Sequence, residues 1–496
     1  PIKVPVYDAD GNPVYEVIPQ DIKFRKVDQL YLKLKDEYLE DNTETLSDDE
    51  EIVIVEDIHS NRYYQATVSY YLPISLEKVT IYDTDIIGYG AFSNYVWLKD
   101  FNYHKIDFKN YNSRNDFEYT ENKEETRTTR LSSYAFYNCD GIELGSFART
   151  DGDGNTYFGF FGTELELGDY TFAHWTGSLM DHVVIAESIE EIGDHAFAES
   201  SIQSVEFDNI VTGTYTFANT DIMTANFNND MLVNIDDGVF YNTIINVIND
   251  TTVMLPDFIR RIGNYTFYNC DNFLFGSRFL NQVVALGDYA FAYCGNIEEI
   301  VLPECLGVQP VSSASVEAIL PEIGAHSFEH NINLRKITFE NATIGDYMFA
   351  NNMSIEEIYV PENIVYVGTH AFAYCENLTY VEYASNYIGD YMFYHCASTT
   401  DPQSFTFNSS DLDGNLTTRP ADDNQIIFGL HVRYIGDFSF ALLPTVSQIT
   451  FDEDPSDLSV GPTYLGSYAF AFSAIQEITL PDSLEEIGEG VLAGCH

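Results

Sequence analysis

Three short segments carry alternating carboxylates beside a glycine, a pattern that could bind calcium. The sequence DxDGN occurs at Asp8–Asn12, Asp151–Asn155 and Asp411–Asn415. Carboxylate oxygens at alternate positions are the hard ligands that Ca²⁺ requires. The candidate ligands are the two aspartates of each segment, Asp8, Asp10, Asp151, Asp153, Asp411 and Asp413.

The same segments also fit a simpler structure. The sixth position of a calcium-binding EF-hand loop should be glycine, but Thr156 and Leu416 stand there, and the glutamate of the twelfth position is absent. All three segments lie between strand-like stretches, where Asp-Gly forms a tight hairpin turn. We therefore expect hairpin turns, with a weak calcium site as the alternative.

The other reactive side chains form no catalytic constellation in the sequence. His195, His326 and His370 occupy a column of a repeat in which tyrosine usually stands. No G-x-S-x-G, H-E-x-x-H or Walker motif occurs. Carboxylate pairs such as Glu298–Glu299 recur among 78 acidic residues, so none stands out as a hydrolase pair. We predict that the chain is not an enzyme and has no cofactor other than the calcium of the alternative above.

Six of the seven cysteines share one position of the same repeat, three residues after its last apolar residue. They are Cys139, Cys270, Cys294, Cys375, Cys396 and Cys495. Other coils place Ser, Thr or Asn there, as at Ser200, Thr220 and Asn352. A position that accepts all four residue types requires a small side chain that can hydrogen-bond to the backbone. Zinc-type C-x-x-C spacing is absent, and the odd count favours buried free thiols over disulfides.

All of these residues are positioned by one repeated phrase: an aliphatic residue, Gly, a polar residue, an aromatic, a small residue and Phe. Clear copies are Ile192–Phe197, Ile262–Phe267, Leu286–Phe291, Ile344–Phe349, Ile388–Phe393, Ile435–Phe440 and Leu465–Phe470. A period of 20 to 27 residues indicates a stack of similar coils, not a globular fold around one pocket. We count about fifteen coils.

A second phrase lies between the copies of the first and predicts a short strand. Examples are IEEIVLP at Ile297–Pro303, IEEIYVP at Ile355–Pro361 and IQEITLP at Ile475–Pro481. Alternation of apolar and polar residues with β-branched enrichment favours a strand with one buried face. Proline fits the strand end because it cannot continue a ladder. Glycine in the first phrase marks a turn or a close approach of two backbones.

Joined together, one coil reads NLxxIxLPxxIxxIGDYAFxxC and resembles the BspA-like, or treponemal-type, leucine-rich repeat family. The resemblance covers Leu72–His496. It implies a mostly β solenoid with a parallel sheet on its concave face and little helix. It also implies secreted or surface proteins of bacteria and some protists, among which known members are associated with adhesion.

The chain divides on these patterns into two regions. Residues 1–71 form a predicted β-rich segment with a hairpin at the first DxDGN and an acidic tract at Asp36–Asp57. Residues 72–496 form the predicted solenoid. Insertions interrupt it near 111–130, 303–321 and 397–425, and such loops often carry the binding character of a repeat protein.

Composition limits the partners. The formal net charge is −55, which opposes binding of nucleic acid or of an anionic membrane surface. No apolar run is long enough to insert into a membrane, and the start lacks a secretory signal. We expect a fragment of a longer protein whose signal and anchor lie outside this sequence.

The outward positions of the predicted strands are the candidate contact residues. Tyr359 with neighbouring Tyr380 and Glu382 is the first choice, because aromatic residues among polar groups suit interfaces. Thr338 and Glu206 occupy the equivalent outward column. The alternative is that Thr and Tyr stand there only because they favour strands.

We predict a non-catalytic, adhesin-like binding module that is extracellular or on a cell surface. Its ligand would be a protein or glycan of a host or neighbouring cell, held by the concave sheet and the inserted loops. The alternative is a structural protein that self-associates into a coat or filament, because an open parallel sheet edge is a template for a further copy.

Overall fold

The structure is a computed structural model of the whole chain. It describes residues 2–7, 13–18, 24–34, 52–56, 62–73, 76–82, 86–104, 127–142, 148–150, 156–158, 163–176, 182–185, 189–208, 212–228, 233–248, 255–273, 276–307, 322–341, 343–364, 366–396, 404–409, 423–454, 456–457 and 459–496. The chain divides into two compact units, Pro1–Ile202 and Gln203–His496. The predicted boundary at residues 71 and 72 stays a prediction.

Unit 1 begins with antiparallel strands and continues with parallel ones. Its antiparallel pairs are β1 (Ile2–Tyr7) with β2 (Pro13–Ile18), β3 (Phe24–Leu34) and β4 (Ile52–Glu56) with β5 (Arg62–Pro73), and β10 (Ala148–Thr150) with β11 (Thr156–Phe158). Among its parallel strands, β6 (Lys78–Tyr82) pairs with β8 (Asp100–His104). Four further strands pair in the order β7 (Ile86–Ile87), β9 (Arg127–Leu131), β12 (Thr163–Leu167) and β14 (Ile189–Ile192). Strand β13 (His182–Ile185) pairs in parallel with β11. The predicted N-terminal hairpin is therefore confirmed.

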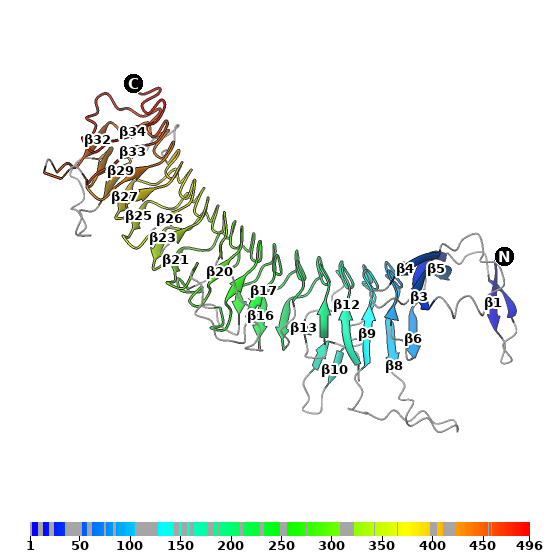
Figure 1. Ribbon diagram of the computed structural model, residues 1–496. Coiled ribbons are helices and arrows are strands. Elements are labelled where there is room, and N and C mark those ends of the chain that lie inside the picture. Colours follow the sequence, from blue (N-terminus) through cyan, green and yellow to red (C-terminus); the bar gives the residue numbers. More distant parts are fainter. Residues whose placement is uncertain are drawn as a thin grey trace. The chain divides into compact units, whose positions relative to one another are not determined.

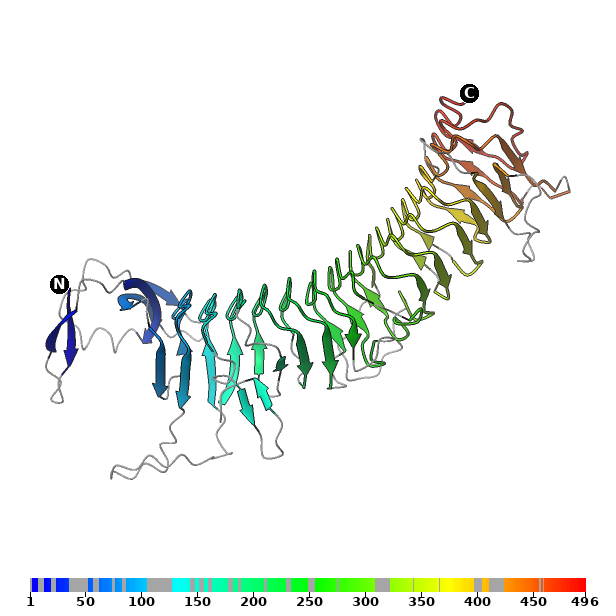
Figure 2. The ribbon, with the colours of Figure 1, turned by 180° about the vertical axis from the view of Figure 1, so that it is seen from behind.

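Unit 2 is a solenoid in which each strand pairs in parallel with its equivalent in a neighbouring coil (Figures 1 and 2). In the described part of unit 2, one set of strands has four residues each, except for the two-residue β18. They are β15 (Ser204–Phe207), β16 (Thr224–Phe227), β18 (Val247–Ile248), β21 (Glu299–Leu302), β23 (Lys336–Phe339), β25 (Glu357–Val360), β27 (Tyr380–Tyr383), β29 (Thr406–Ser409), β30 (Gln425–Phe428) and β32 (Gln448–Phe451).

A second set of two-residue strands leads into the turns of unit 2. These are β17 (Asn234–Ile235), β19 (Arg261–Ile262), β20 (Ala285–Leu286), β22 (Glu322–Ile323), β24 (Thr343–Ile344), β26 (Tyr366–Val367), β28 (Tyr387–Ile388), β31 (Tyr434–Ile435), β33 (Tyr464–Leu465) and β34 (Glu486–Ile487). The described residues contain strands and turns but no α-helix. The predicted leucine-rich repeat solenoid is confirmed.

Each repeated phrase folds into the same turn, which contains two left-handed residues. In one coil these are Tyr289, with φ of 55°, and Tyr293, with φ of 60°. A bulky residue rarely adopts this conformation. It is held here because alternate amides point to the next coil: the N–H of Tyr289 donates to Ala325 at 3.0 Å and that of Tyr293 to Glu329 at 2.9 Å.

The glycine of the phrase allows two coils to approach closely. A Cβ placed on Gly287 would lie 2.5 Å from the backbone nitrogen of Asn264 in the preceding coil. Real Cβ atoms do not approach a backbone this closely, so only glycine fits without a shift of the coils. The predicted close approach is confirmed.

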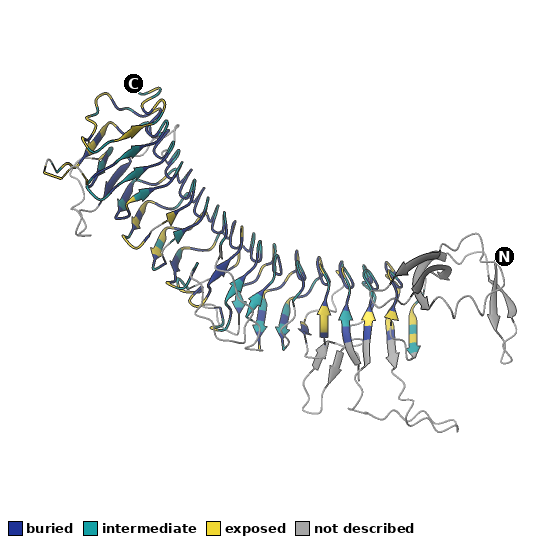
Figure 3. Cartoon of the chain, in the orientation of Figure 1, coloured by how far each residue is buried: buried dark blue, intermediate teal, exposed yellow. Residues whose placement is uncertain are grey.

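The phrase-ending phenylalanines form the core. Phe267, Phe291 and Phe328 are fully buried, and successive rings stack with centroids 5.1 and 5.5 Å apart. Buried residues continue from coil to coil through unit 2 (Figure 3). Each buried Phe contributes about 1.5–3 kcal/mol through removal of apolar surface from water.

Candidate binding groove

The predicted calcium ligands lie outside the described residues, so calcium binding stays a prediction. The strands that flank the first two DxDGN segments pair antiparallel, which is the hairpin connection expected. The third expectation is wrong: β29 and β30, on either side of Asp411–Asn415, pair in parallel. A parallel pair needs a crossover connection, so β29 and β30 are not joined by a hairpin. Within the described ranges, no group of three metal-ligating side chains occurs.

The histidines belong to a ladder of stacked rings, as the repeat columns predict. His326 stacks between Tyr289 and Tyr347, with ring centroids 4.4 and 4.5 Å away. His370 stacks between Tyr347 and Tyr391 at 4.3 Å from each. Burial lowers the pKa of His370, and this outweighs the opposite effect of Asp346 and Asp390. These rings cover one another's faces, so they are structural.

The cysteine column bridges adjacent coils, and its thiols are free. The Sγ of Cys294 donates to the carbonyl of Phe267, one coil earlier, at 3.0 Å. Equivalent bonds run from Cys139 to Phe92, from Cys270 to Phe240, from Cys375 to Phe349, from Cys396 to Phe372 and from Cys495 to Phe470. The hydroxyl of Ser200 instead donates to Phe197 in its own coil, at 2.6 Å. The predicted role, a small side chain that satisfies the backbone, is confirmed.

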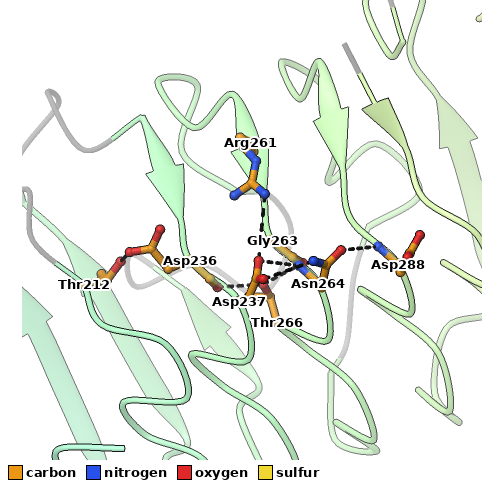
Figure 4. Close-up of polar contacts among 8 residues, drawn as sticks. All are labelled: Thr212, Asp236, Asp237, Arg261, Gly263, Asn264, Thr266 and Asp288. Atoms are coloured by element: carbon orange, nitrogen blue, oxygen red, sulfur yellow. Dashed lines mark hydrogen bonds and ion pairs between the residues drawn. The ribbon is translucent and has the colours of Figure 1, made fainter. Parts of the chain in front are cut away.

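The polar residue at the third position of the phrase, which follows the glycine in most copies, forms a second ladder that sequence reasoning missed. The Oδ1 of Asp237 accepts the N–H of Asn264 at 2.8 Å, and the Oδ1 of Asn264 accepts the N–H of Asp288 at 2.7 Å (Figure 4). Arg261 lies 3.8 Å from the Asp237 carboxylate. The alternation of Asp, Asn and Ser after the glycine was the available signal, because all three accept hydrogen bonds. These carboxylates hold coils together, so they are poor candidates for ligand binding.

The outward face of β23, β25 and β27 differs, because it is hollowed into a groove of about 970 Å³. Its lining includes Thr338, Tyr359, Tyr380 and Glu382, four of the five predicted contact residues. Glu206 is half-buried on β15, opposite Asn226, and is not part of this lining. The parallel sheet thus brings the predicted contact residues Thr338 and Glu382, which are 44 positions apart in sequence, into one groove.

Tyr359 is the exposed aromatic wall of the groove. Its side chain is 45% exposed, and it lies opposite Glu382 in the parallel register of β25 and β27. Partial burial raises the pKa of Tyr359, with smaller contributions from Glu382 and Glu362. Thr338, on the neighbouring coil, is also exposed.

Tyr380 corrects one expectation, because it is not an exposed contact residue. It shares the outward face of β27 with Glu382 but is only 8% exposed. Strand alternation gave its face correctly, but alternation carries no information on how far neighbouring side chains cover a large ring. Tyr380 therefore contributes to the floor of the groove and offers little surface to a ligand.

Glu382 is the least satisfied charged group in the groove. Its Oε1 is buried without a hydrogen-bond partner, and burial raises the pKa of its carboxyl. The two cations of the lining are already engaged: Arg335 pairs with Glu298, and Lys336 lies 3.6 Å from Glu299. A ligand that supplied a donor to Glu382 would compensate a carboxylate that the protein leaves unpaired.

The sequence analysis missed the residues at one edge of the groove. Asn333, Ser354 and Asn377 precede the strand positions in three successive coils and line it. Each donates from its side chain to a carbonyl of the preceding coil, as Asn377 does to Met353 at 2.7 Å. The recurrent Asn of the consensus NLxxIxLP was the signal that could have identified them. The predicted insertions near 111–130, 303–321 and 397–425 fall largely outside the described residues.

Comparisons with known proteins agree with this fold. The family model of the BspA type leucine rich repeat region matches in six copies, over residues 67–150, 165–270, 246–312, 307–410 and 423–496. A leucine-rich repeat protein from Bacteroides ovatus ATCC 8483 is similar with a TM-score of 0.52 and 15% identity, over 88% of this chain and 100% of that one. Curated proteins gave no match.

Two further solved structures are more distantly similar. A leucine-rich repeat protein from Eubacterium ventriosum ATCC 27560 has a TM-score of 0.38 and 19% identity, over 74% of this chain and 82% of its own. A leucine rich cell surface protein from Faecalibacterium prausnitzii A2-165 has a TM-score of 0.35 and 17% identity, over 71% and 85%. In the described part of the chain, no helix is long and apolar enough to cross a membrane.

Proposed function

The chain belongs to the BspA-type leucine-rich repeat family, and from this premise we propose that it is a non-catalytic, adhesin-like binding protein. It binds a protein or glycan outside the cell, through the outward face of its strand sheet. The observation that carries this proposal is the groove over β23, β25 and β27, where Tyr359 stands exposed beside Glu382. Aromatic side chains in a partly desolvated polar setting are the residues that dominate binding energies.

The rest of the repeat supports the choice of this face. The cysteine, aspartate and histidine columns are occupied with bonds and stacking between coils. The residues at the outward strand positions of the groove have no such shared structural role, so their types can vary without weakening the packing of one coil on the next. A sheet held by neighbouring coils is also rigid, which lowers the ordering cost of binding. The inserted loops would add selectivity.

Two measurements test the proposal: a screen for ligands and a determination of the molar mass in solution. The purified chain is applied to an array of extracellular proteins and glycans, and its mass is followed by light scattering over a wide range of concentration, with and without calcium. Saturable binding to particular spots by a protein of constant monomeric mass supports a binding module. A mass that grows with concentration, without any array ligand, contradicts it and favours the self-assembling coat or filament.

A further inference from the structure

The groove over β23, β25 and β27 carries an excess of negative charge. Its lining contains the carboxylates Glu298, Glu299, Glu356, Glu357 and Glu382 and the cations Arg335 and Lys336, so five charges oppose two. Both cations are paired within the lining, with Glu298 and Glu299. The three remaining carboxylates give the groove its net charge of −3, and a cation would be attracted there.

The pair Tyr359 and Glu382 adds geometry to this charge. The two residues lie opposite each other on adjacent strands, so a phenol ring and a carboxylate meet on the same face. A guanidinium can lie against an aromatic ring and donate to a carboxylate at the same time. The Oε1 of Glu382 has no partner in the protein, which leaves an acceptor for such a donor once the side chain reorients.

We propose that this groove binds an extended peptide segment through an arginine side chain seated between Tyr359 and Glu382. The inference rests on the proposed binding function and names its ligand class. The groove holds about 970 Å³, and its lining runs from Glu299 on β21 across β23 and β25 to Glu382 on β27, which suits an extended segment better than a single ion. Glu356 and Glu357 are exposed and would attract further basic residues of the same peptide.

The net charge of −55 attracts any cation weakly, so the test must separate the groove from the bulk surface. The probe is the peptide acetyl-Gly-Arg-Gly-Arg-Gly-amide, with the glutamine analogue as the neutral control, titrated calorimetrically. The groove variants are Tyr359→Ala and Glu382→Gln. Their matched controls are Tyr366→Ala, an exposed tyrosine on β26, and Glu206→Gln, a half-buried glutamate on β15.

We expect the arginine peptide to bind and the glutamine peptide not to bind. Tyr359→Ala and Glu382→Gln should each weaken binding at least about fivefold, while the controls change it less than about twofold. Tyr359→Phe should retain most of the affinity, because it keeps the ring, and it shows that the alanine effect is not a folding defect. Equal effects of groove and control variants would overturn the inference, since they indicate bulk attraction.

A second outcome separates this inference from the proposed function. If an array ligand, such as a neutral glycan, binds in a Tyr359-dependent way while the arginine peptide does not, the cationic ligand class is wrong and the binding function stands. If neither the array nor the peptide gives binding, both proposals are contradicted.

Discussion

Tyr359 on β25 lies directly opposite Glu382 on β27, and the two come from coils that are 23 residues apart in sequence. The pairing places an exposed ring beside a carboxylate whose Oε1 has no partner. Neither side chain serves the stack in the way that Cys294 or Asp237 does. Burial disfavours the charged form of Glu382, and its side chain does not link neighbouring coils. An ionisable residue of this kind is a candidate for function.

The first prediction concerns the dependence of stability on pH that the partly buried carboxyl of Glu382 causes. Because burial raises the pKa of Glu382, the ionised carboxylate is disfavoured in the folded state. The folded chain binds this proton more tightly than the unfolded chain, so stability falls as pH rises from the ordinary carboxyl range toward neutrality. Glu382→Gln should therefore raise the melting temperature at pH 7, with a smaller gain near pH 4. Loss of stability at pH 7 in a melting scan would contradict this account of Glu382.

The second prediction concerns the buried thiols. Burial raises the pKa of Cys270 and of Cys375 to about 12, so almost no thiolate forms near neutral pH. Iodoacetamide near pH 8 should label the partly exposed Cys305 and Cys495 and spare the five buried cysteines. Peptide mass spectrometry reads the sites, and a urea-denatured sample, in which all seven should react, is the control. Early labelling of Cys294 would contradict this prediction, because it would show that the reagent reaches the buried cysteines in the folded chain.

The third prediction tests the bridge between coils. Asn352 donates to the carbonyls of Phe328 and Phe349 at 3.0 and 2.8 Å, and its Oδ1 accepts the N–H of Asn331 at 2.7 Å. Asn352→Ala removes all three bonds and should cost roughly 3 kcal/mol. Asn352→Cys should recover part of this, because cysteine makes one such bond in other coils.

The control for this prediction is Asn377→Ala. Asn377 is exposed and its side chain donates to the carbonyl of Met353, so its loss should cost less than about 1 kcal/mol. Melting of the three variants gives the ranking. Equal melting temperatures for Asn352→Ala and Asn377→Ala would show that the column position does not bind the coils.

The fourth prediction concerns the loss of stability at acidic pH. The pKa of His370 is lowered by burial, so the neutral ring is favoured in the folded state. The unfolded chain takes up this proton more readily, and stability is lost as pH falls below the ordinary histidine value of about 6.5. His370→Tyr places the usual residue of this column between Tyr347 and Tyr391 and removes that loss. The drop in melting temperature between about pH 8 and pH 5.5 should shrink, and an unchanged drop would contradict the role of His370.

The sequence predicted the solenoid well, because its signals are periodic. The Phe column, the strand phrase and the small polar column each recur at one place in every coil, so errors in one copy do not matter. The backbone conformation of the turn was harder to predict from the sequence. Left-handed backbone is usually predicted from glycine, whereas Tyr289, Tyr293 and their equivalents adopt it because the next coil accepts their amides.

The candidate site was predicted only in part. Strand alternation placed Thr338, Tyr359 and Glu382 on one face, which the structure shows. It could not show that Tyr380 is covered, because cover depends on neighbouring coils. The parallel pairing around Asp411–Asn415 was also missed, since a local Asp-Gly pattern does not reveal which strands pair. The edge residues Asn333 and Asn377 were overlooked as ordinary parts of the consensus.

The central claim is that ligands bind to the groove beside Tyr359, and one comparison tests it most directly. Wild type, Tyr359→Ala and Tyr366→Ala, all confirmed as folded by their melting temperatures, are applied side by side to the same array of extracellular proteins and glycans. The account predicts that Tyr359→Ala loses the signals of the wild type while Tyr366→Ala keeps them. Retention of every signal by Tyr359→Ala would contradict the groove as the binding site.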